Sequence, residues 1–532
     1  MSDRKPRFTD VDLERSIPAG TLGRQVRTAV GWTLVGNWGA FAAQLVTTMV
    51  LARLLSPEDY GLVGMVLTIT VFVDQFRTMG LSQAVVQREN LTVAQVNALF
   101  YVNAAVGFGL AGIVALGAPL VASFYGRSEL VGITVALAAT YALGGLGVQA
   151  NALLTRQLNF RALAIRYTVA RLLASAAAIA AALGGLGYWS LVVQQVSMSL
   201  FSLLLVWVAV KWRPGRPGGF RSALPLVKFG AGITGAGIFN TLGGVGDALL
   251  IGRFLGAADL GLYTRAAHLE SMPLQQLRQP LNGAVTPLLS SLQREPDRYR
   301  ALYTKAIGGL AVVGLPGTAV LAVGAEDVIA VFLGDQWLAA TPIMRWMAVG
   351  GAVALITSSV AWLYQSSGRG NAFATWSGAA SVVILASYAV GLAWGVVGVA
   401  AAGALVQIAL APLAFLFAIR GTPITMHDVG ASIARPLLVA VAVLVTSLAA
   451  WWLVPGSIGH LATLVMLGAV AGGTWLAVVG AWPSARRQAM DLVNVARQRG
   501  SRRPAPPPDQ PEPPQPADTS MPVPAAERED YR

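Results

Sequence analysis

Long apolar stretches alternate with short polar segments along most of this chain. Between Gly31 and Trp482 the apolar runs are about 20 residues long, and a helix of that length crosses a hydrocarbon core of roughly 30 Å. The pattern predicts an all-α, polytopic membrane protein with about fourteen transmembrane helices. The predicted spans lie near residues 30–50, 60–80, 97–117, 130–150, 168–185, 188–210, 229–251, 260–285, 306–324, 346–366, 373–393, 396–418, 436–453 and 460–482.

Two polar elbows between apolar runs, 200 positions apart, carry nearly the same sequence. The first reads RLLSPEDYGL (53–62) and the second reads RFLGAADLGL (253–262). Another pair, VASFYG (121–126) and IAVFLG (329–334), recurs at a similar spacing. Such repeats predict two pseudo-symmetric six-helix bundles, which share one membrane orientation because six is an even number. Two additional C-terminal helices have no counterpart in the first half.

Composition shifts along the chain predict its divisions. The basic sequence KWRPGRPGG (211–219) breaks helices and separates six spans from the next eight. Beyond Arg499 prolines recur among polar residues, a composition typical of a disordered or polyproline-like tail. The predicted divisions are a cytoplasmic N-terminal segment 1–29, an N-terminal bundle 30–210, a basic cytoplasmic linker 211–228, a C-terminal bundle 229–418, two additional transmembrane helices 436–482 and a cytoplasmic tail 483–532.

The placement of charge indicates how the chain is oriented. Charged residues make up 12% of the 532 residues, against about 25% in soluble proteins. The net charge of +13 does not indicate nucleic acid, because the basic residues concentrate in the loops on one side and in the terminal segments. The positive-inside rule then predicts that both termini are cytoplasmic, which suits the bacterial inner membrane. The basic residues expected in the loops of the other side are Arg53, Arg127, Arg253 and Arg345.

Catalytic motifs are missing from the sequence. It has no cysteine, no GxxxxGK[ST] phosphate loop and no HExxH, and its three histidines are widely separated. A membrane-embedded enzyme would need a carboxylate pair in an outer-side loop, where Glu326-Asp327 is a weak candidate. We therefore expect no enzymatic activity, no bound metal and no cofactor.

Ionisable and polar residues inside the spans are the main candidate site. Each charge costs roughly 2.5–3.5 kcal/mol at mid-membrane, so such groups rarely face lipid. The eighth span also contains Pro273 and Pro280, and a broken polar helix is tolerated only where protein or a water-filled cavity surrounds it. We expect these groups to line a central substrate path, although structural ion pairing is the alternative for each. The candidates are Asp74, Arg77, Asp247, Arg265, His268, Glu270, Gln275 and Arg278.

Several other polar residues admit two interpretations. Asp247 can hold a coupling cation, or it can pair with Arg253 or Arg265. Arg53 and Arg253 can bind phosphate, but a cap on the carbonyl end of the preceding helix is favoured. Another set can hydrogen-bond either sugars or neighbouring helices, and it comprises Asn37, Gln44, Gln194 and Gln195.

Four segments resemble a known family of membrane proteins. They read LARLLSPEDYGLVGMV (51–66), GLSQAVVQ (80–87), DALLIGRFLGAADLGLYTRA (247–266) and PLLSSLQREPDRYR (287–300). They resemble the polysaccharide-biosynthesis flippases, which are the Wzx-type transporters of the multidrug/oligosaccharidyl-lipid/polysaccharide exporter superfamily, and most closely the WzxC-like branch. The resemblance covers roughly residues 25–480 and implies two bundles around a V-shaped cavity.

The resemblance also implies a function. It implies flipping of undecaprenyl-pyrophosphate-linked oligosaccharide from the cytoplasmic to the periplasmic leaflet by alternating access, for exopolysaccharide, capsule or O-antigen. Coupling to Na⁺ or H⁺ stays open. The implied partners are the lipid-linked oligosaccharide, membrane lipids, and a polysaccharide polymerase with its co-polymerase; no nucleic acid is expected. The family's cavity is cationic, which Arg77, Arg265 and Arg278 match by location, whereas Asp74, Asp247 and Glu270 make the path mixed.

Two alternatives remain at this point. A cation-coupled exporter of small drugs from the same superfamily would have a smaller, more acidic and aromatic pocket. A non-transporting membrane scaffold of a polysaccharide synthase would tolerate neutralisation of the charges inside the spans.

Overall fold

The computed structural model describes residues 39, 41–78, 85, 92–157, 159–215, 244–453 and 459–481, except for the side chains of 75–78. Every regular element in these ranges is a helix, as the sequence predicts, and they contain no strand. The predicted N-terminal segment, most of the predicted linker and the Pro-rich tail lie outside the described residues.

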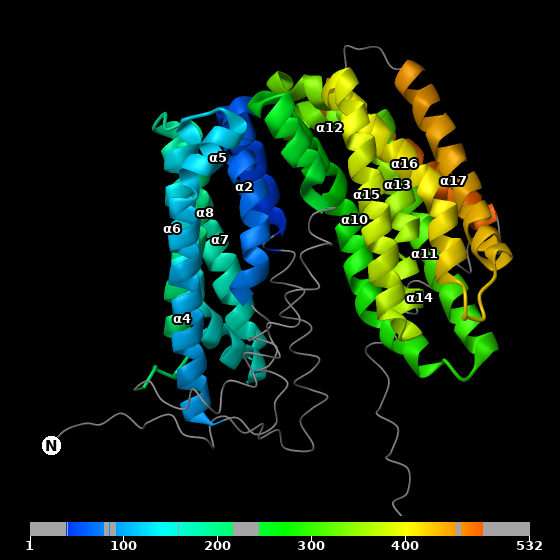
Figure 1. Cartoon of the computed structure of the whole chain (residues 1–532). Helices are drawn as coiled ribbons and strands as arrows, with labels where there is room; N and C mark the ends of the chain where they lie inside the picture. Colours follow the sequence, from blue (N-terminus) through cyan, green and yellow to red (C-terminus); the bar gives the residue numbers. More distant parts are fainter. Residues whose placement is uncertain are drawn as a thin grey trace, which may run out of the picture.

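The first half of the chain forms one bundle of helices (Figure 1). A short apolar helix, Phe41–Leu54, precedes the first elbow. The remaining helices of this half are α2 (Pro57–Thr78), α4 (Val93–Leu116), the short α5 (Ala118–Tyr125), α6 (Glu129–Arg156), α7 (Phe160–Leu183) and α8 (Trp189–Ala209).

The second half forms a separate bundle, whose first described helical segment covers residues 244–254. The helices that follow are α10 (Ala257–Ser291), α11 (Pro296–Val323), the short α12 (Ala325–Phe332), the 3₁₀ turn η2 (Asp335–Ala340), α13 (Thr341–Thr357), α14 (Val360–Ser366), α15 (Gly370–Gly391), the turn η3 (Leu392–Trp394), α16 (Gly395–Ala418), α17 (Met426–Leu453) and α18 (His460–Ala481).

The chain is a multi-pass membrane protein. In the described residues nine segments are long and apolar enough to cross a membrane, and one of them, Gly370–Ala418, contains both α15 and α16. The helices α2 and α10 occupy predicted spans but are not among the nine. The first and seventh predicted spans lie partly outside the described residues, so the predicted count of fourteen is not confirmed.

The two related elbows are built by different local devices. At the first, the Ser56 N–H and hydroxyl donate to Asp59 Oδ2 at 2.9 and 2.7 Å, and the Asp59 N–H donates to Ser56 Oγ at 3.2 Å. This arrangement is a capping box, and Pro57 occupies the first helical position, where no N–H is needed. At the second elbow Gly256 has φ 100°, a conformation that favours glycine. Both devices start a helix directly after an apolar helix.

Small residues let helices approach closely inside each bundle. A Cβ on Gly107 of α4 would lie 2.8 Å from the Tyr141 carbonyl oxygen of α6, and one on Gly145 of α6 would lie 2.6 Å from the Asn103 carbonyl oxygen. Glycines are suited to this contact because their backbones can touch. The crossing of α4 and α6 therefore depends on two glycines that face each other.

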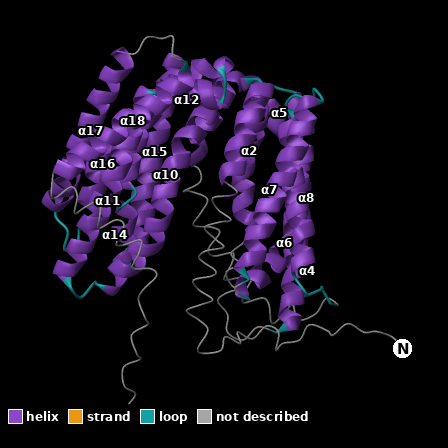
Figure 2. Ribbon diagram, turned by 180° about the vertical axis from the view of Figure 1, so that it is seen from behind, coloured by secondary structure: helices purple, strands orange, loops and turns teal. Residues whose placement is uncertain are grey.

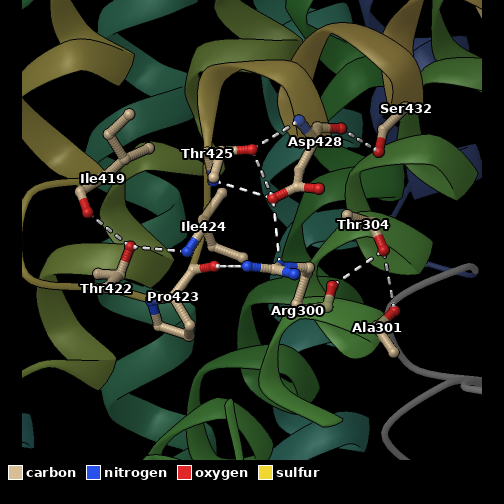
Figure 3. Close-up of polar contacts among 10 residues, drawn as sticks. All are labelled: Arg300, Ala301, Thr304, Ile419, Thr422, Pro423, Ile424, Thr425, Asp428 and Ser432. Carbon is tan, nitrogen blue, oxygen red and sulfur yellow. Dashed lines mark hydrogen bonds and ion pairs between the residues drawn. The ribbon is translucent and has the colours of Figure 1, made fainter. Parts of the chain in front are cut away.

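The helix pair α17–α18 is fastened to the second bundle at both ends. At one end Arg300 of α11 donates from Nε and Nη2 to the Pro423 carbonyl at 3.1 and 2.9 Å, and its Nε lies 3.3 Å from Asp428 Oδ2 (Figure 3). At the opposite end His460 Nδ1 of α18 lies 2.8 Å from Asp327 Oδ1 of α12. Between them the Trp475 Nε1–H donates to the Val312 carbonyl at 2.8 Å.

The two bundles meet at the end of the molecule that carries α5 and α12, and their helices diverge toward the other end in both views (Figures 1 and 2). Among helix pairs from different halves, α2 and α10 pack most closely. We call this contact the seam: it comprises the first turns of α2 and α10 together with Gln336 and Trp337 of η2, which contact the first half. The seam positions the site described next.

Candidate functional site

A pocket of about 490 Å³ adjoins the seam, between the two halves. Its wall on α2 follows the helical period, because residues three and four positions apart lie on one face. The residues of that face are Tyr60, Val63, Gly64, Leu67, Thr68 and Val71. The first half also contributes Gln44, Arg171, Ala174, Ser175, Leu191, Gln194, Gln195 and Met198, and the second half contributes Val245, Thr264, Arg265 and His268.

Basic groups from both halves converge on this pocket. Arg265 of α10 lies over the ring of Tyr60, with its guanidinium carbon 4.7 Å from the ring centroid. Arg171 of α7 donates from Nη1 to the side-chain carbonyl of Gln44 and from Nη2 to the Tyr167 hydroxyl at 3.0 Å. The pocket thus has one arginine on each side.

The described wall of the pocket is cationic, because it contains Arg171 and Arg265 and no acidic residue. In the described part of the chain, the Nε atoms of Arg171 and Arg265 and the Nε2 atom of His268 are buried without a hydrogen-bond partner. A buried polar group without a partner costs free energy that a ligand can recover. The two guanidinium groups in the wall therefore favour a ligand with acceptor oxygens and negative charge.

Neutral hydrogen-bonding groups cover another part of the wall. Gln194 and Gln195 lie on α8, and Ser175 lies on α7, where its hydroxyl contacts the Thr47 hydroxyl at 2.7 Å. Amides and hydroxyls both donate and accept, as sugar hydroxyls require. The pocket thus combines a cationic part with a neutral polar part.

Two predicted path residues do not line the pocket: Asp247 lies in the helix 244–254, and Glu270 lies on another face of α10. Asp247 Oδ2 accepts from the Tyr263 hydroxyl at 2.7 Å, and neither residue lines the pocket. Glu270 is 8% exposed and points at α13, where its Oε1 occupies the space that a Gly351 side chain would need. Asp247 and Glu270 thus belong to the interior of the second bundle. Among the predicted residues on α10, Arg265 and His268 line the pocket and Glu270 does not.

Three other predicted site residues do not line the described wall of this pocket. Gln275 is exposed and Arg278 is half-buried further along α10, and Asp74 is half-buried in α2. The side chain of Arg77 lies outside the described residues.

Arg171 and Tyr60 were not among the predicted site residues. Arg171 could have been found, because it is a charge inside a predicted span, and the cost argument that selected Arg265 applies to it equally. Tyr60 carried no such signal. Its role depends on contacts with α10 and η2, which come from the other half of the chain.

Comparison with known proteins places the chain in a family. Residues 50–342, more than half of the chain, match the family described as "Polysaccharide biosynthesis protein". The chain belongs to this family. Its relatives in the polysaccharide biosynthesis family include the succinoglycan biosynthesis transport protein ExoT of Rhizobium meliloti (strain 1021), which is 27% identical over 66% of this chain and 72% of its own length.

Two further relatives have comparable coverage. The teichuronic acid biosynthesis protein TuaB of Bacillus subtilis (strain 168) is 25% identical over 67% of this chain and 74% of its own length. The lipopolysaccharide biosynthesis protein WzxC of Escherichia coli (strain K12) is 22% identical over 66% and 71%. The resemblance found in the sequence is confirmed.

Solved structures establish the fold of this family member. The lipid II flippase MurJ in an inward closed conformation superimposes with a TM-score of 0.67, at 12% identity over 85% of this chain and 99% of that one. An inward-facing multidrug resistance transporter of the MATE family gives a TM-score of 0.59, at 13% identity over 74% and 95%. The all-α membrane fold with two bundles is thus shared with known transporters.

Proposed function

We propose that this family member is a flippase that moves undecaprenyl-pyrophosphate-linked oligosaccharide from the cytoplasmic to the outer leaflet of the bacterial inner membrane. The observation that carries the proposal is the pocket between the halves, which presents Arg171, Arg265 and His268 without an acidic lining residue in the described wall. The relatives named for transport and for biosynthesis of surface polysaccharides support the same function.

The chemistry of the pocket suits the polar part of such a lipid. A pyrophosphate carries several negative oxygens, and the guanidinium groups of Arg171 and Arg265 offer planar, paired donors for them. The neighbouring amides of Gln194 and Gln195 suit the hydroxyls of the first sugar. No covalent step is needed, so the proposed activity is transport without catalysis.

Alternating access follows from the arrangement of the two halves. They touch at the seam, and their helices diverge at the other end (Figure 1). A substrate that binds one arrangement better than the other shifts the population between them. The loops and helix ends at the end of the molecule opposite the seam carry the basic residues Arg294, Arg298, Arg369 and Arg420. The positive-inside rule therefore favours a cytoplasmic location for that end and for both termini.

Coupling and assembly complete the proposal. Asp247 and Glu270, both inside the second bundle, provide carboxylates at which Na⁺ or H⁺ can couple to the movement. A polymerase and its co-polymerase would take the flipped repeat units outside. These parts of the proposal rest on the presence of the transport activity.

The two alternatives make different demands on the pocket. A drug exporter that takes cations would place carboxylates in the wall, whereas this described wall holds arginines. A scaffold for a polysaccharide synthase would not need the arginines at all. Replacement of Arg265 therefore distinguishes the proposed flippase from these two alternatives.

The test replaces Arg265 by Ala and measures transport of a pyrophosphate-linked oligosaccharide lipid in proteoliposomes. Loss of charge-assisted hydrogen bonds, each worth about 1.5–3 kcal/mol, predicts that apparent affinity falls about 10- to 100-fold. Arg298→Ala is the matched control, because its side chain is 74% exposed and paired with Glu295. Unchanged transport by Arg265→Ala at normal abundance would contradict the proposal.

A further inference from the structure

Two arginines of the second bundle lie over aromatic rings, at the end of the bundle where α14 lies in Figure 1. Arg420 follows the end of α16 by two residues, and its guanidinium carbon lies 4.6 Å from the ring centroid of Phe417. Arg369 directly precedes α15, and its guanidinium carbon lies 5.0 Å from the ring centroid of Tyr364 in α14. A cation over a ring face is attracted by the ring without losing its charge, as it would beside a carboxylate.

Each of these rings packs against a second ring, which belongs to α15. The ring centroids of Phe417 and Trp376 are 5.3 Å apart, and those of Tyr364 and Phe373 are 5.4 Å apart. Phe373 and Trp376 lie on one face of α15, because they are three positions apart. One arrangement, an arginine over a pair of rings, therefore occurs twice. We call the set the double cluster: Tyr364, Arg369, Phe373, Trp376, Phe417 and Arg420.

The two arginines gather at the same helix end. Arg369 donates from Nη2 to the Ala418 carbonyl, at the end of α16, and from Nε to the Ser367 hydroxyl at 2.9 Å. Arg420 follows that carbonyl by two residues. Both arginines also interact electrostatically with Tyr364. A single ligand can therefore meet both charges.

No carboxylate of the described residues forms an ion pair with Arg369 or Arg420. At the same end of the molecule Arg298 pairs with Glu295, and Arg300 pairs with Asp428. Arg369 caps the last turn of α16, whereas Arg420 is exposed and donates no hydrogen bond to a described residue. The planar fork of an arginine in this state suits a phosphate.

The start of α15 provides a further attraction for an anion. Arg369 is the N-cap residue of α15, and no side chain caps the helix there. The first N–H groups of a helix favour negative charge, and a positive charge alone is unfavourable at this position. An anion held by Arg369 would satisfy both the helix end and the arginine.

An exposed apolar strip leads away from the double cluster. Leu413, Leu416 and Phe417 are exposed, and they share one face of α16 because they are three and four positions apart. On α15 the exposed Val383 follows Trp376 by seven positions, so it lies on the same face. The strip and the double cluster do not line the pocket. In a membrane-spanning helix pair, such a strip suits acyl chains.

We propose that the double cluster binds an anionic phospholipid of the surrounding bilayer, with its phosphate on Arg369 and Arg420 and its acyl chains along the apolar strip. Basic sites between transmembrane helices suit acidic head groups, and aromatic rings prefer the level of the head groups. The orientation proposed above places this site in the cytoplasmic leaflet. The site is separate from the pocket, and the binding requires no transport.

The test measures the binding of phosphatidylglycerol to the purified full-length protein in detergent by native mass spectrometry, with zwitterionic phosphatidylcholine as the reference lipid. The parent should retain phosphatidylglycerol in preference. Arg420→Gln should raise its Kd about fivefold, and Arg369→Gln/Arg420→Gln about tenfold or more. The matched control is Arg294→Gln/Arg298→Gln, which removes the same charge from two exposed residues at the same end. The control should change the Kd by less than about twofold.

A second pair of variants isolates the contribution of the rings. Phe417→Leu keeps the charge of Arg420 and removes the ring beneath it, so the Kd should rise about threefold. Phe108→Leu is the matched control, because Phe108 is an exposed phenylalanine of α4. Glycerol phosphate should not displace the lipid, because it cannot use the apolar strip.

Three results would overturn the proposal. The first is a control double variant that loses as much affinity as Arg369→Gln/Arg420→Gln, since net charge alone would then explain the binding. The second is a Kd for Arg420→Gln equal to that of the parent, and this variant stays informative if loss of the Arg369 bonds prevents folding. The third is displacement of the lipid by glycerol phosphate, which would identify a site for free phosphate.

Discussion

Glu270 and Gly351 compete for one space inside the second bundle. The Oε1 atom of Glu270 lies where a Gly351 side chain would begin, and it has no hydrogen-bond partner among the described residues. The Cδ1 atom of Leu274 in α10 also lies close, 3.2 Å from the position that a Cβ at residue 351 would occupy. Only glycine at position 351 leaves room for a carboxylate here.

Gly351→Ala is expected to destabilise the protein by about 1–3 kcal/mol, because overpacking displaces Glu270. The measurement is thermal unfolding in detergent. The double variant Glu270→Ala/Gly351→Ala should recover most of the loss, since the competing atoms are gone. Gly378→Ala is the control, because a Cβ there meets nothing within 4 Å. Equal destabilisation of the single and double variants would contradict this account.

Part of the residue pattern on α10 can be read from the sequence. At 100° per residue, Arg265 and His268 lie close together around the helix, whereas Tyr263 and Glu270 lie on the far side. The division into a pocket face and a buried face was therefore predictable. Which face meets α13 was not, because that contact joins segments far apart in the chain.

The helix α17 depends on its first turn for its position against α11. Asp428 accepts from the Thr425 N–H and hydroxyl at 2.9 and 2.8 Å, and it also contacts Arg300 (Figure 3). The carboxylate thus caps its own helix and pairs with another. Helices of this length are stabilised mainly by packing, so the cap decides where the helix begins.

Asp428→Ala should therefore cost more than Arg300→Ala. The aspartate loses a cap worth about 1 kcal/mol together with the ion pair. The arginine side chain is 45% exposed, and exposed pairs contribute about 0–1 kcal/mol. Thermal unfolding of both variants, with Arg298→Ala as a surface control, gives the order. A larger effect of Arg300→Ala would show that its bonds to the Pro423 carbonyl dominate.

The whole molecule reuses one elbow twice, and the amino-acid sequence alone predicts this symmetry. The close approach of Gly61 to Ala257 and of Gly261 to Pro57 cannot be predicted in the same way, nor can the hydrogen bonds that η2 donates to the first half. The equivalent arginines of the two elbows also make different contacts. Arg53 donates a hydrogen bond to the Val331 carbonyl of the second half, whereas Arg253 lies over the Phe124 ring of the first half. Contacts between distant segments need the docking of two halves, which local periodicity does not encode.

The ring of Tyr60 connects the seam with the pocket. Tyr60 lies under Arg265 and against Trp337, so an anion that draws Arg265 away from the ring changes one contact of the seam. A ligand shifts an equilibrium only if it binds the two states differently. Movement of Arg265 would supply that difference.

The chain has no cysteine, so Val71→Cys places a single thiol in the pocket wall. Undecaprenyl pyrophosphate should then speed the labelling of this thiol by a membrane-impermeant maleimide added from the seam side of oriented vesicles. The response should depend on the ring at position 60. Tyr60→Phe keeps the ring and should keep most of the acceleration. Tyr60→Ala removes both contacts, so it should raise the basal rate and abolish the response to the lipid. If Tyr60→Ala responds as strongly as Tyr60→Phe, the connection between the pocket and the seam runs through other residues.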